Sequence, residues 1–172
     1  VFSTTLAEYT LHMERHAAIV YPKDTAFLVH YGDVRPGMRV VEAGLGSGSL
    51  TANLLTAVGE GGHVTSYELV ESTAGRALKN LSTWFESLDN HTVHFKDIYQ
   101  GIEETHLDRV ILDVPEPWQV LDTAAEALVN GGIFAAYLPT ILQVQKLMLA
   151  LKDNLHYYTS EALEVLERKW HV

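Results

Sequence analysis

The stretch Glu42-Ala43-Gly44-Leu45-Gly46-Ser47-Gly48 decides the fold class of this 172-residue chain. Directly before the glycines, residues 38–43 form a short apolar run of the length of a buried strand. After them, apolar residues recur at helical spacing over 50–58, and Gly59 is typical of a helix end. Glycine lets the backbone turn sharply and lets a ligand come close to it. The stretch therefore predicts a ligand-binding turn between a strand and a helix.

The rest of the chain repeats this alternation of strand and helix. Further strands are expected at 63–68, 92–97, 108–113, 133–137 and 163–172. Helices are expected at 5–16, 24–31, 71–85, 122–128 (closed by Asn-Gly-Gly at 130–132) and 142–151. This order predicts an α/β fold with a doubly wound, mostly parallel sheet. The length suits one domain, with N-terminal helices in 1–35 and an α/β core in 36–172.

Composition sets limits on location and partners. The chain has no cysteine, which excludes disulfides and thiolate metal sites and favours a reducing, cytoplasmic location. It contains no apolar run of membrane-spanning length, and residues 1–5 do not have the layout of a signal peptide. The net charge of −10 disfavours a nucleic-acid partner, although the charge of a whole chain says little about one face.

Details of the glycine stretch indicate which ligand it binds. A dinucleotide-binding turn has a third glycine where this chain has Ser49, and Gly48 instead completes a G-x-G-x-G pattern. That pattern is more similar to a turn that binds S-adenosylmethionine. Glu68 follows Gly46 by 22 positions, close to the spacing at which a carboxylate reaches a ribose diol, and Asp97 ends the next strand. A structural turn and two ordinary strand ends remain the alternative.

The strand at 108–113 leads into Asp113-Val114-Pro115-Glu116-Pro117-Trp118. Two prolines stiffen this turn and fix the directions of its carbonyl groups. The segment resembles the Asp/Asn-Pro-Pro-Tyr signature of amino-methyltransferases that act on adenine, with Trp118 at the stacking position and one additional residue between the prolines. The alternative is a proline-rich strand exit with a core tryptophan.

Two other chemistries find little support. His12 and His16 lie one helical turn apart, but their order is not that of a zinc-binding His-Glu-x-x-His motif, and no third ligand is apparent. No metal is therefore expected. Ser47 and Ser49 do not lie in the Gly-x-Ser-x-Gly turn of serine hydrolases.

Taken together, the motifs resemble those of the tRNA (adenine-58-N1)-methyltransferases of bacteria and archaea, a family with a Rossmann-like class I methyltransferase fold. The likeness runs from position 5 to 172. The stretches that carry it are 5–9, 21–24, 42–48, 66–68, 108–118, 136–140 and 170–172.

The resemblance implies a set of site residues. Those implied to bind S-adenosylmethionine are Glu42, Gly44, Gly46, Ser47, Gly48, Ser49, Leu50, Glu68, Asp97 and Asp113. Asp113 is implied to be the catalytic carboxylate, and Tyr21 and Tyr137 to lie beside the target base, which Pro115 and Trp118 also contact. The implied reaction is methyl transfer to N1 of adenine 58 in the T-loop of tRNA, by a homotetramer that grips tRNA across its subunits.

Two departures from the family pattern leave alternatives open. Family members carry a small β-rich domain before the region that corresponds to residue 1, and they continue beyond 170–172 into the last strands of the sheet. The chain is therefore expected to be a fragment of a longer enzyme. The alternatives are a methyltransferase with another acceptor, such as adenine N6 in nucleic acid or a protein amide, and a tRNA-binding subunit of the same fold without activity.

Overall fold

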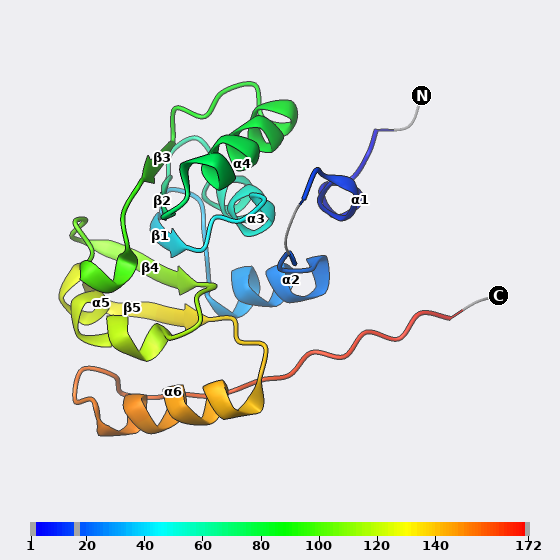
Figure 1. The fold of residues 1–172 in the computed structure, drawn as a ribbon. Coiled ribbons are helices and arrows are strands. Elements are labelled where there is room, and N and C mark those ends of the chain that lie inside the picture. The colour runs from blue at the N-terminus through cyan, green and yellow to red at the C-terminus, as the bar shows by residue number, and fades with distance from the viewer. Residues whose placement is uncertain (1–2, 16–17, 171–172) are drawn as a thin grey trace.

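The computed structural model describes residues 3–15 and 18–170, and it shows a five-stranded parallel sheet in the order β3-β2-β1-β4-β5 (Figure 1). The strands are β1 (Arg39–Ala43), β2 (His63–Tyr67), β3 (His91–His94), β4 (Leu107–Leu112) and β5 (Leu128–Ala136). The expected α/β fold with a doubly wound sheet is confirmed. Every strand pairing among the described residues is parallel.

Helices cover both faces of this sheet (Figure 1). They are α1 (Leu6–His12), α2 (Pro22–Tyr31), α3 (Ser49–Val58), α4 (Glu71–Trp84), α5 (Leu121–Ala127) and α6 (Ile141–Asp153), with 3-10 turns η1 (Ile98–Gln100) and η2 (Pro117–Val120). Val40 of β1 packs in a cluster with α3, whereas its neighbour Val41 packs in a second cluster with η1 and α5. Burial on both faces explains why the central strands contain consecutive apolar residues, Val40 and Val41 in β1 and 110–112 in β4.

The order of the strands places the site. β1 lies between β2 and β4, because the chain leaves β3 at the edge and crosses over to β4 on the other side of β1. In the register of these pairs, Ala43 lies beside both Tyr67 and Leu112. The three segments that follow these strands therefore open side by side, where ligands bind in open α/β sheets.

The first helix is shorter than its sequence predicts. The pattern predicted a helix over 5–16, but α1 ends at His12, and His16 lies outside the described residues. The side-chain amide of Asn80 on α4 donates a hydrogen bond to the backbone carbonyl of Glu14 at 2.9 Å. This contact holds the chain against α4 in a non-helical path.

Strand β5 begins earlier than predicted. Residues 130–132 were expected to close a helix, yet they lie within β5. Leu107 pairs with Leu128 and Arg109 with Ile133, so β5 uses five positions where β4 uses two. Gly131, with a φ of +79°, helps to accommodate the additional residues as an irregularity in the strand.

The expected last strand at 163–172 is wrong for the residues that the structure describes, which end at 170. Residues 159–170 run as an extended coil past α6, and they touch α2 where the Lys23 ammonium donates to the Val165 carbonyl at 3.1 Å (Figure 1). Leu166 and Trp170 are 86% and 80% exposed. An apolar alternation alone does not make a strand when no neighbouring strand pairs with it.

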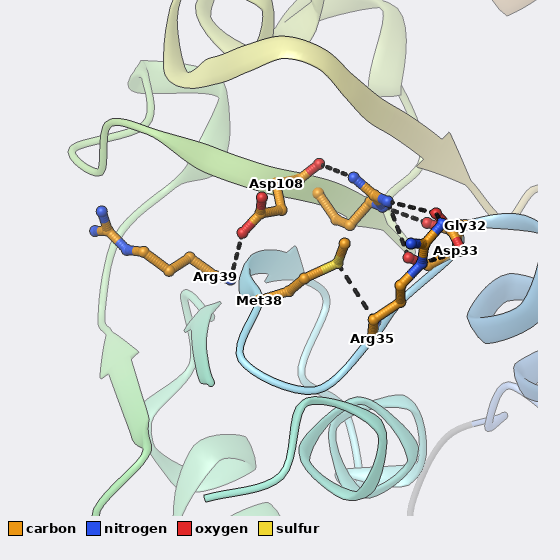
Figure 2. A network of polar contacts seen from close by, with 7 residues as sticks. Gly32, Asp33, Arg35, Met38, Arg39 and Asp108 are labelled. Carbon is orange, nitrogen blue, oxygen red and sulfur yellow. Dashed lines mark hydrogen bonds and ion pairs between the residues drawn. The ribbon is translucent and has the colours of Figure 1, made fainter. Parts of the chain in front are cut away.

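The opposite end of the sheet carries a polar network that anchors α2 (Figure 2). The buried Arg109 guanidinium donates to the carbonyl oxygens of Gly32, Asp33 and, at 2.7 Å, Asp108. It also forms an ion pair with the Asp33 carboxylate at 3.2 Å. Arg109 thus satisfies the carbonyl groups of the two residues that follow α2, whereas carbonyl groups in its last turn accept from backbone N–H groups.

The described residues include neither a membrane-spanning helix nor a cluster of metal ligands. No helix there is long and apolar enough to cross a membrane. Within the same residues, no group of three or more histidine, aspartate or glutamate side chains is arranged to hold a metal ion.

Candidate functional site

Three glycines shape the turn after β1. Gly44, Gly46 and Gly48 have φ values of +89°, +53° and +85°, in the left-handed region that other residues avoid. At Gly44 the requirement is also steric, because a Cβ atom there would lie 2.2 Å from the backbone oxygen of Asp113. The turn after β1 and the segment after β4 are therefore in direct backbone contact.

Asp113 lies at the centre of this contact. Its N–H donates to the Ala43 carbonyl at 2.9 Å. Its carboxylate has no hydrogen-bond or ion-pair partner in the part of the chain that the structure describes, and burial raises its pKa to about 6. A small pocket is lined by Asp113 together with the glycine turn and residues 18–20. The site thus holds a partly desolvated carboxylate without a hydrogen-bond partner, beside a turn whose Gly44 and Gly46 carry no side chain.

Glu68 faces the same turn from the end of β2. One carboxylate oxygen accepts a long hydrogen bond of 3.4 Å from the Gly46 N–H, and the other accepts from the Val70 N–H at 2.9 Å. Both acceptor atoms lie at the rim of the sheet, where the sequence predicted a contact with a ribose.

Asp97 begins η1 after the end of β3. Its side chain accepts a hydrogen bond from the Tyr99 N–H at 3.0 Å and so caps the turn. The residue is only partly buried, and the cap uses one of its two carboxylate oxygens. The other oxygen is available for the predicted contact with an adenine amine.

Glu42 lies beneath the turn, turned into the sheet. Its carboxylate is 1% exposed and accepts a hydrogen bond of 2.6 Å from the Ser66 hydroxyl, while its Oε2 atom has no partner among the described residues. Burial raises its pKa to about 7, and the negative charge of Asp113 adds to this effect. A direct contact between Glu42 and a cofactor, which the resemblance implied, stays a prediction; in the structure Glu42 supports the turn from below.

Ser47, Ser49 and Leu50 also support the turn. The Ser49 hydroxyl donates to the Val20 carbonyl at 2.7 Å, and the Ser47 carbonyl accepts from the Asn80 side chain at 3.0 Å. Leu50 packs in the core cluster with α3. These residues hold the turn in place, and their contacts with a cofactor stay predictions.

The two tyrosines expected beside the target base occupy different environments. The Tyr137 hydroxyl donates to the Asp24 carboxylate at 3.4 Å, and its pKa is raised by burial and by the charges of Asp24 and Asp113. Tyr137 therefore lies close enough to the Asp113 carboxylate to interact with its charge. Tyr21, at the start of α2, is 43% exposed.

The proline segment is held from both sides. From α6, the Gln143 amide donates to the Pro115 carbonyl at 3.0 Å, and the Lys146 ammonium lies 4.1 Å from the centre of the Trp118 ring. From η1, the Tyr99 hydroxyl accepts from the Glu116 N–H at 2.9 Å. Lys146 covers one face of Trp118, so a base that stacks on this ring must use the other face or displace the lysine.

Tyr99, Gln143 and Lys146 are not among the site residues predicted from the sequence. Each lies outside the recognised motifs and meets the proline segment only through the packing of η1 or α6. The residues carry no local pattern that would indicate these contacts.

Comparison with known proteins identifies the family of this chain. The family described as the tRNA methyltransferase complex GCD14 subunit matches residues 1–172. The chain belongs to this tRNA methyltransferase family. It is 42% identical, over its whole length, to the tRNA (adenine(58)-N(1))-methyltransferase TrmI of Thermus thermophilus. It is 31% identical, over 96% of its length, to the tRNA (adenine(57)-N(1)/adenine(58)-N(1))-methyltransferase TrmI of Methanocaldococcus jannaschii.

Two solved structures share the fold. A SAM-dependent O-methyltransferase from Thermotoga maritima superposes with a TM-score of 0.82 at 39% identity, and covers 87% of this chain. The tRNA (m1A58) methyltransferase TrmI of Aquifex aeolicus gives a TM-score of 0.80 at 31% identity, and covers 88% of this chain. The family likeness inferred from the motifs and the class I methyltransferase architecture are confirmed.

The chain matches part of these relatives. It spans 67% of the Thermus and Methanocaldococcus enzymes. It spans 56% of the Thermotoga chain and 61% of the Aquifex chain.

Proposed function

We propose that this chain transfers a methyl group from S-adenosylmethionine to N1 of an adenine in tRNA, at position 58. Membership of the family and the named activities of relatives at 42% and 31% identity support the reaction type. The observation that carries the proposal is Asp113, whose carboxylate has no partner in the described structure and whose backbone contacts the turn at Gly44. A donor on the turn and an acceptor at the carboxylate would then be neighbours.

The donor fits the residues at the three strand ends. The side-chain-free turn at Gly44 and Gly46 leaves room for a ligand against the backbone. Glu68 would accept hydrogen bonds from the two ribose hydroxyls, and Asp97 would accept from the adenine amine. When bound, S-adenosylmethionine supplies a methyl group on a positively charged sulfur, which is already a strong electrophile. We propose residues 1–172 as the domain that binds this donor.

The chain's part in the reaction is to orient the acceptor base and to stabilise the positive charge that develops on it. Adenine N1 has a lone pair in the plane of the ring, so alignment of the acceptor supplies much of the catalysis. As N1 gains the methyl group, positive charge spreads to the exocyclic amine. An anionic Asp113 that accepts a hydrogen bond from this amine interacts more strongly as the charge grows, which favours the transition state over the ground state.

The acceptor must also be exposed, because N1 lies on the base-pairing edge. An enzyme that reacts there draws the base out of its stack and supports the ring with aromatic side chains. Tyr21, Tyr137 and the open face of Trp118 are the candidates for this support, and the Pro115 carbonyl is a further acceptor for the amine.

We infer the wider context from the same family. The partner is tRNA, the location is the cytoplasm, and the assembly is a homotetramer. A grip on tRNA shared between subunits, or with residues outside this chain, would reconcile RNA binding with a net charge of −10.

Methylation of defined transcripts by the purified protein tests the proposal. Unmodified tRNA should accept labelled methyl from S-adenosylmethionine, and a transcript with guanine in place of adenine 58 should accept almost none. Digestion of the product should give 1-methyladenosine. Label in N6-methyladenosine, equal labelling of both transcripts, or no transfer to any nucleic acid would overturn the proposal.

A further inference from the structure

The turn η1 joins the two halves of the candidate site. Its first contact is with the donor side, where the Asp97 carboxylate accepts from the Tyr99 N–H at 3.0 Å. Its second contact is with the acceptor side, where the hydroxyl of the same tyrosine accepts from the Glu116 N–H at 2.9 Å. The backbone N–H of Tyr99 thus binds the carboxylate that is expected to hold the donor adenine, and its side-chain hydroxyl binds the proline segment.

The connection through Tyr99 is short, and packing holds it in place. Tyr99 lies two positions after Asp97, and its ring packs against the buried cluster that contains Ile98 and Val110. The segment between η1 and β4 is fixed as well, because the buried Tyr67 hydroxyl donates to the Glu104 carboxylate at 2.7 Å. The other oxygen of Glu104 meets the His94 imidazole at 2.8 Å. The segment from Asp97 to Glu104 is therefore held by contacts at both ends.

The proline segment is placed to respond to such a displacement. Tyr99 holds it at Glu116, between Asp113 and Trp118, while Gln143 of α6 holds the neighbouring Pro115 carbonyl at 3.0 Å. Two opposed hydrogen bonds thus set the position of this segment, and one of them comes from the donor side.

We propose that Tyr99 is a positioning residue that transmits the binding of the donor adenine at Asp97 to the acceptor segment at Glu116. This inference rests on the proposed function, since it takes Asp97 as a donor contact and residues 113–118 as the acceptor contact. Donor binding that orders Asp97 tightens η1, and the Tyr99 hydroxyl then fixes the segment that carries Asp113 and Trp118. The site reaches its reactive geometry only when the donor is bound.

Trp118 supplies a readout that needs no methyl transfer. Its ring lies under the Lys146 ammonium, so a small movement of the segment changes the charge beside the indole and shifts its emission. The other tryptophans, Trp84 and Trp170, are replaced by phenylalanine to isolate this signal. The probe is S-adenosylhomocysteine, and calorimetry gives its dissociation constant for each variant.

The variant is Tyr99→Phe, which keeps the ring and removes the hydroxyl. The matched control is Tyr157→Phe, whose hydroxyl donates to the Leu121 carbonyl at 2.8 Å, outside residues 97–99 and 113–118. We expect S-adenosylhomocysteine to shift the Trp118 emission in the parent protein and in the control. In Tyr99→Phe the shift should fall by more than half while the dissociation constant changes less than threefold. At saturating donor, kcat for tRNA should fall about fivefold, as for the loss of one hydrogen bond.

Three results would overturn the inference: no emission shift in the parent protein, a full shift in Tyr99→Phe, or a loss of shift matched by an equal loss of S-adenosylhomocysteine affinity. Failure of the proposed function looks different. In that case the protein binds S-adenosylhomocysteine and Trp118 responds through Tyr99, but tRNA accepts no methyl group.

Discussion

At the scale of single residues, the site combines two carboxylates with raised pKa values and different roles. Asp113 faces the pocket, and burial raises its pKa to about 6. Glu42 lies beneath the turn, and burial raises its pKa to about 7. The first carboxylate is placed to meet a ligand, whereas the second is placed to hold the backbone that meets it.

Asp113→Ala should lower kcat for tRNA about a hundredfold, because the developing charge on the acceptor loses its anionic partner. The dissociation constant of S-adenosylhomocysteine should change less than threefold.

In the unaltered protein, kcat/KM should fall as pH drops below about 6, since protonation removes the negative charge of Asp113. A pH profile that stays flat between 5 and 7, or a variant with unchanged turnover, would remove this role from Asp113.

Glu42→Gln should stabilise the protein at high pH. The pKa of Glu42 is about 7 in the folded state and near 4.5 in the unfolded state, so folding favours the protonated form. The stability that this group contributes is largest below pH 4.5 and is lost as pH rises to 7. The variant should therefore be more stable than the parent by up to about 3 kcal/mol above pH 7, and equally stable near pH 4.

Thermal unfolding at pH 4, 6 and 8 measures this difference. The control is Glu126→Gln on α5, which removes an exposed carboxylate. An equal gain or loss of stability for Glu42→Gln at all three pH values would show that burial of its charge is not the cause.

At the scale of elements, the structure depends on close contacts between segments that are distant in the chain. The sequence predicted which residues form most strands and helices, because apolar periodicity and glycine positions are local signals. It placed Glu68 and Asp113 at strand ends, and in the structure each follows its strand directly. It also placed Asp97 at the end of a strand over 92–97, but β3 ends at His94 and Asp97 caps η1. It did not show that α6 and η1 hold the proline segment, since these contacts depend on how the elements pack.

Gly44→Ala tests the contact between the turn and the segment after β4. A Cβ at this position would lie 2.2 Å from the Asp113 backbone oxygen, and the φ of +89° is unfavourable for alanine. We expect a loss of about 2–4 kcal/mol in unfolding free energy and loss of S-adenosylhomocysteine binding. Gly59→Ala is the control, because its φ of +62° is also positive but no atom crowds the new Cβ. Equal losses in the two variants would attribute the effect to backbone strain alone.

Arg109→Met tests the anchor of α2 at the other end of the sheet (Figure 2). The change removes the donors that satisfy the carbonyl oxygens of Gly32, Asp33 and Asp108, and should lower the unfolding free energy by about 2–3 kcal/mol. Arg39→Met is the matched control, because Arg39 enters the network only through its backbone N–H. Denaturant unfolding should show little change for the control, and equal losses would contradict the assignment.

At the scale of the whole molecule, β5 is the outermost strand on its side of the sheet and pairs with β4. The free edge of such a strand presents backbone groups that can pair with another chain. We expect the 172-residue chain to associate with itself as its concentration rises. Val129→Lys, an exposed position on β5, should weaken this association, whereas Ile141→Lys on α6 should not. Sedimentation that shows a monomer at every concentration would contradict the expectation.

The backbone contact between Gly44 and Asp113 also bears on how such proteins can be recombined. The two positions are 69 residues apart (113 − 44), yet the backbone oxygen of Asp113 lies where a side chain on residue 44 would begin. A chimera that takes its first half from one relative and its second half from another must therefore inherit a matched pair of loops. Crossover points between these positions should give fewer working hybrids than points that keep both loops from one parent.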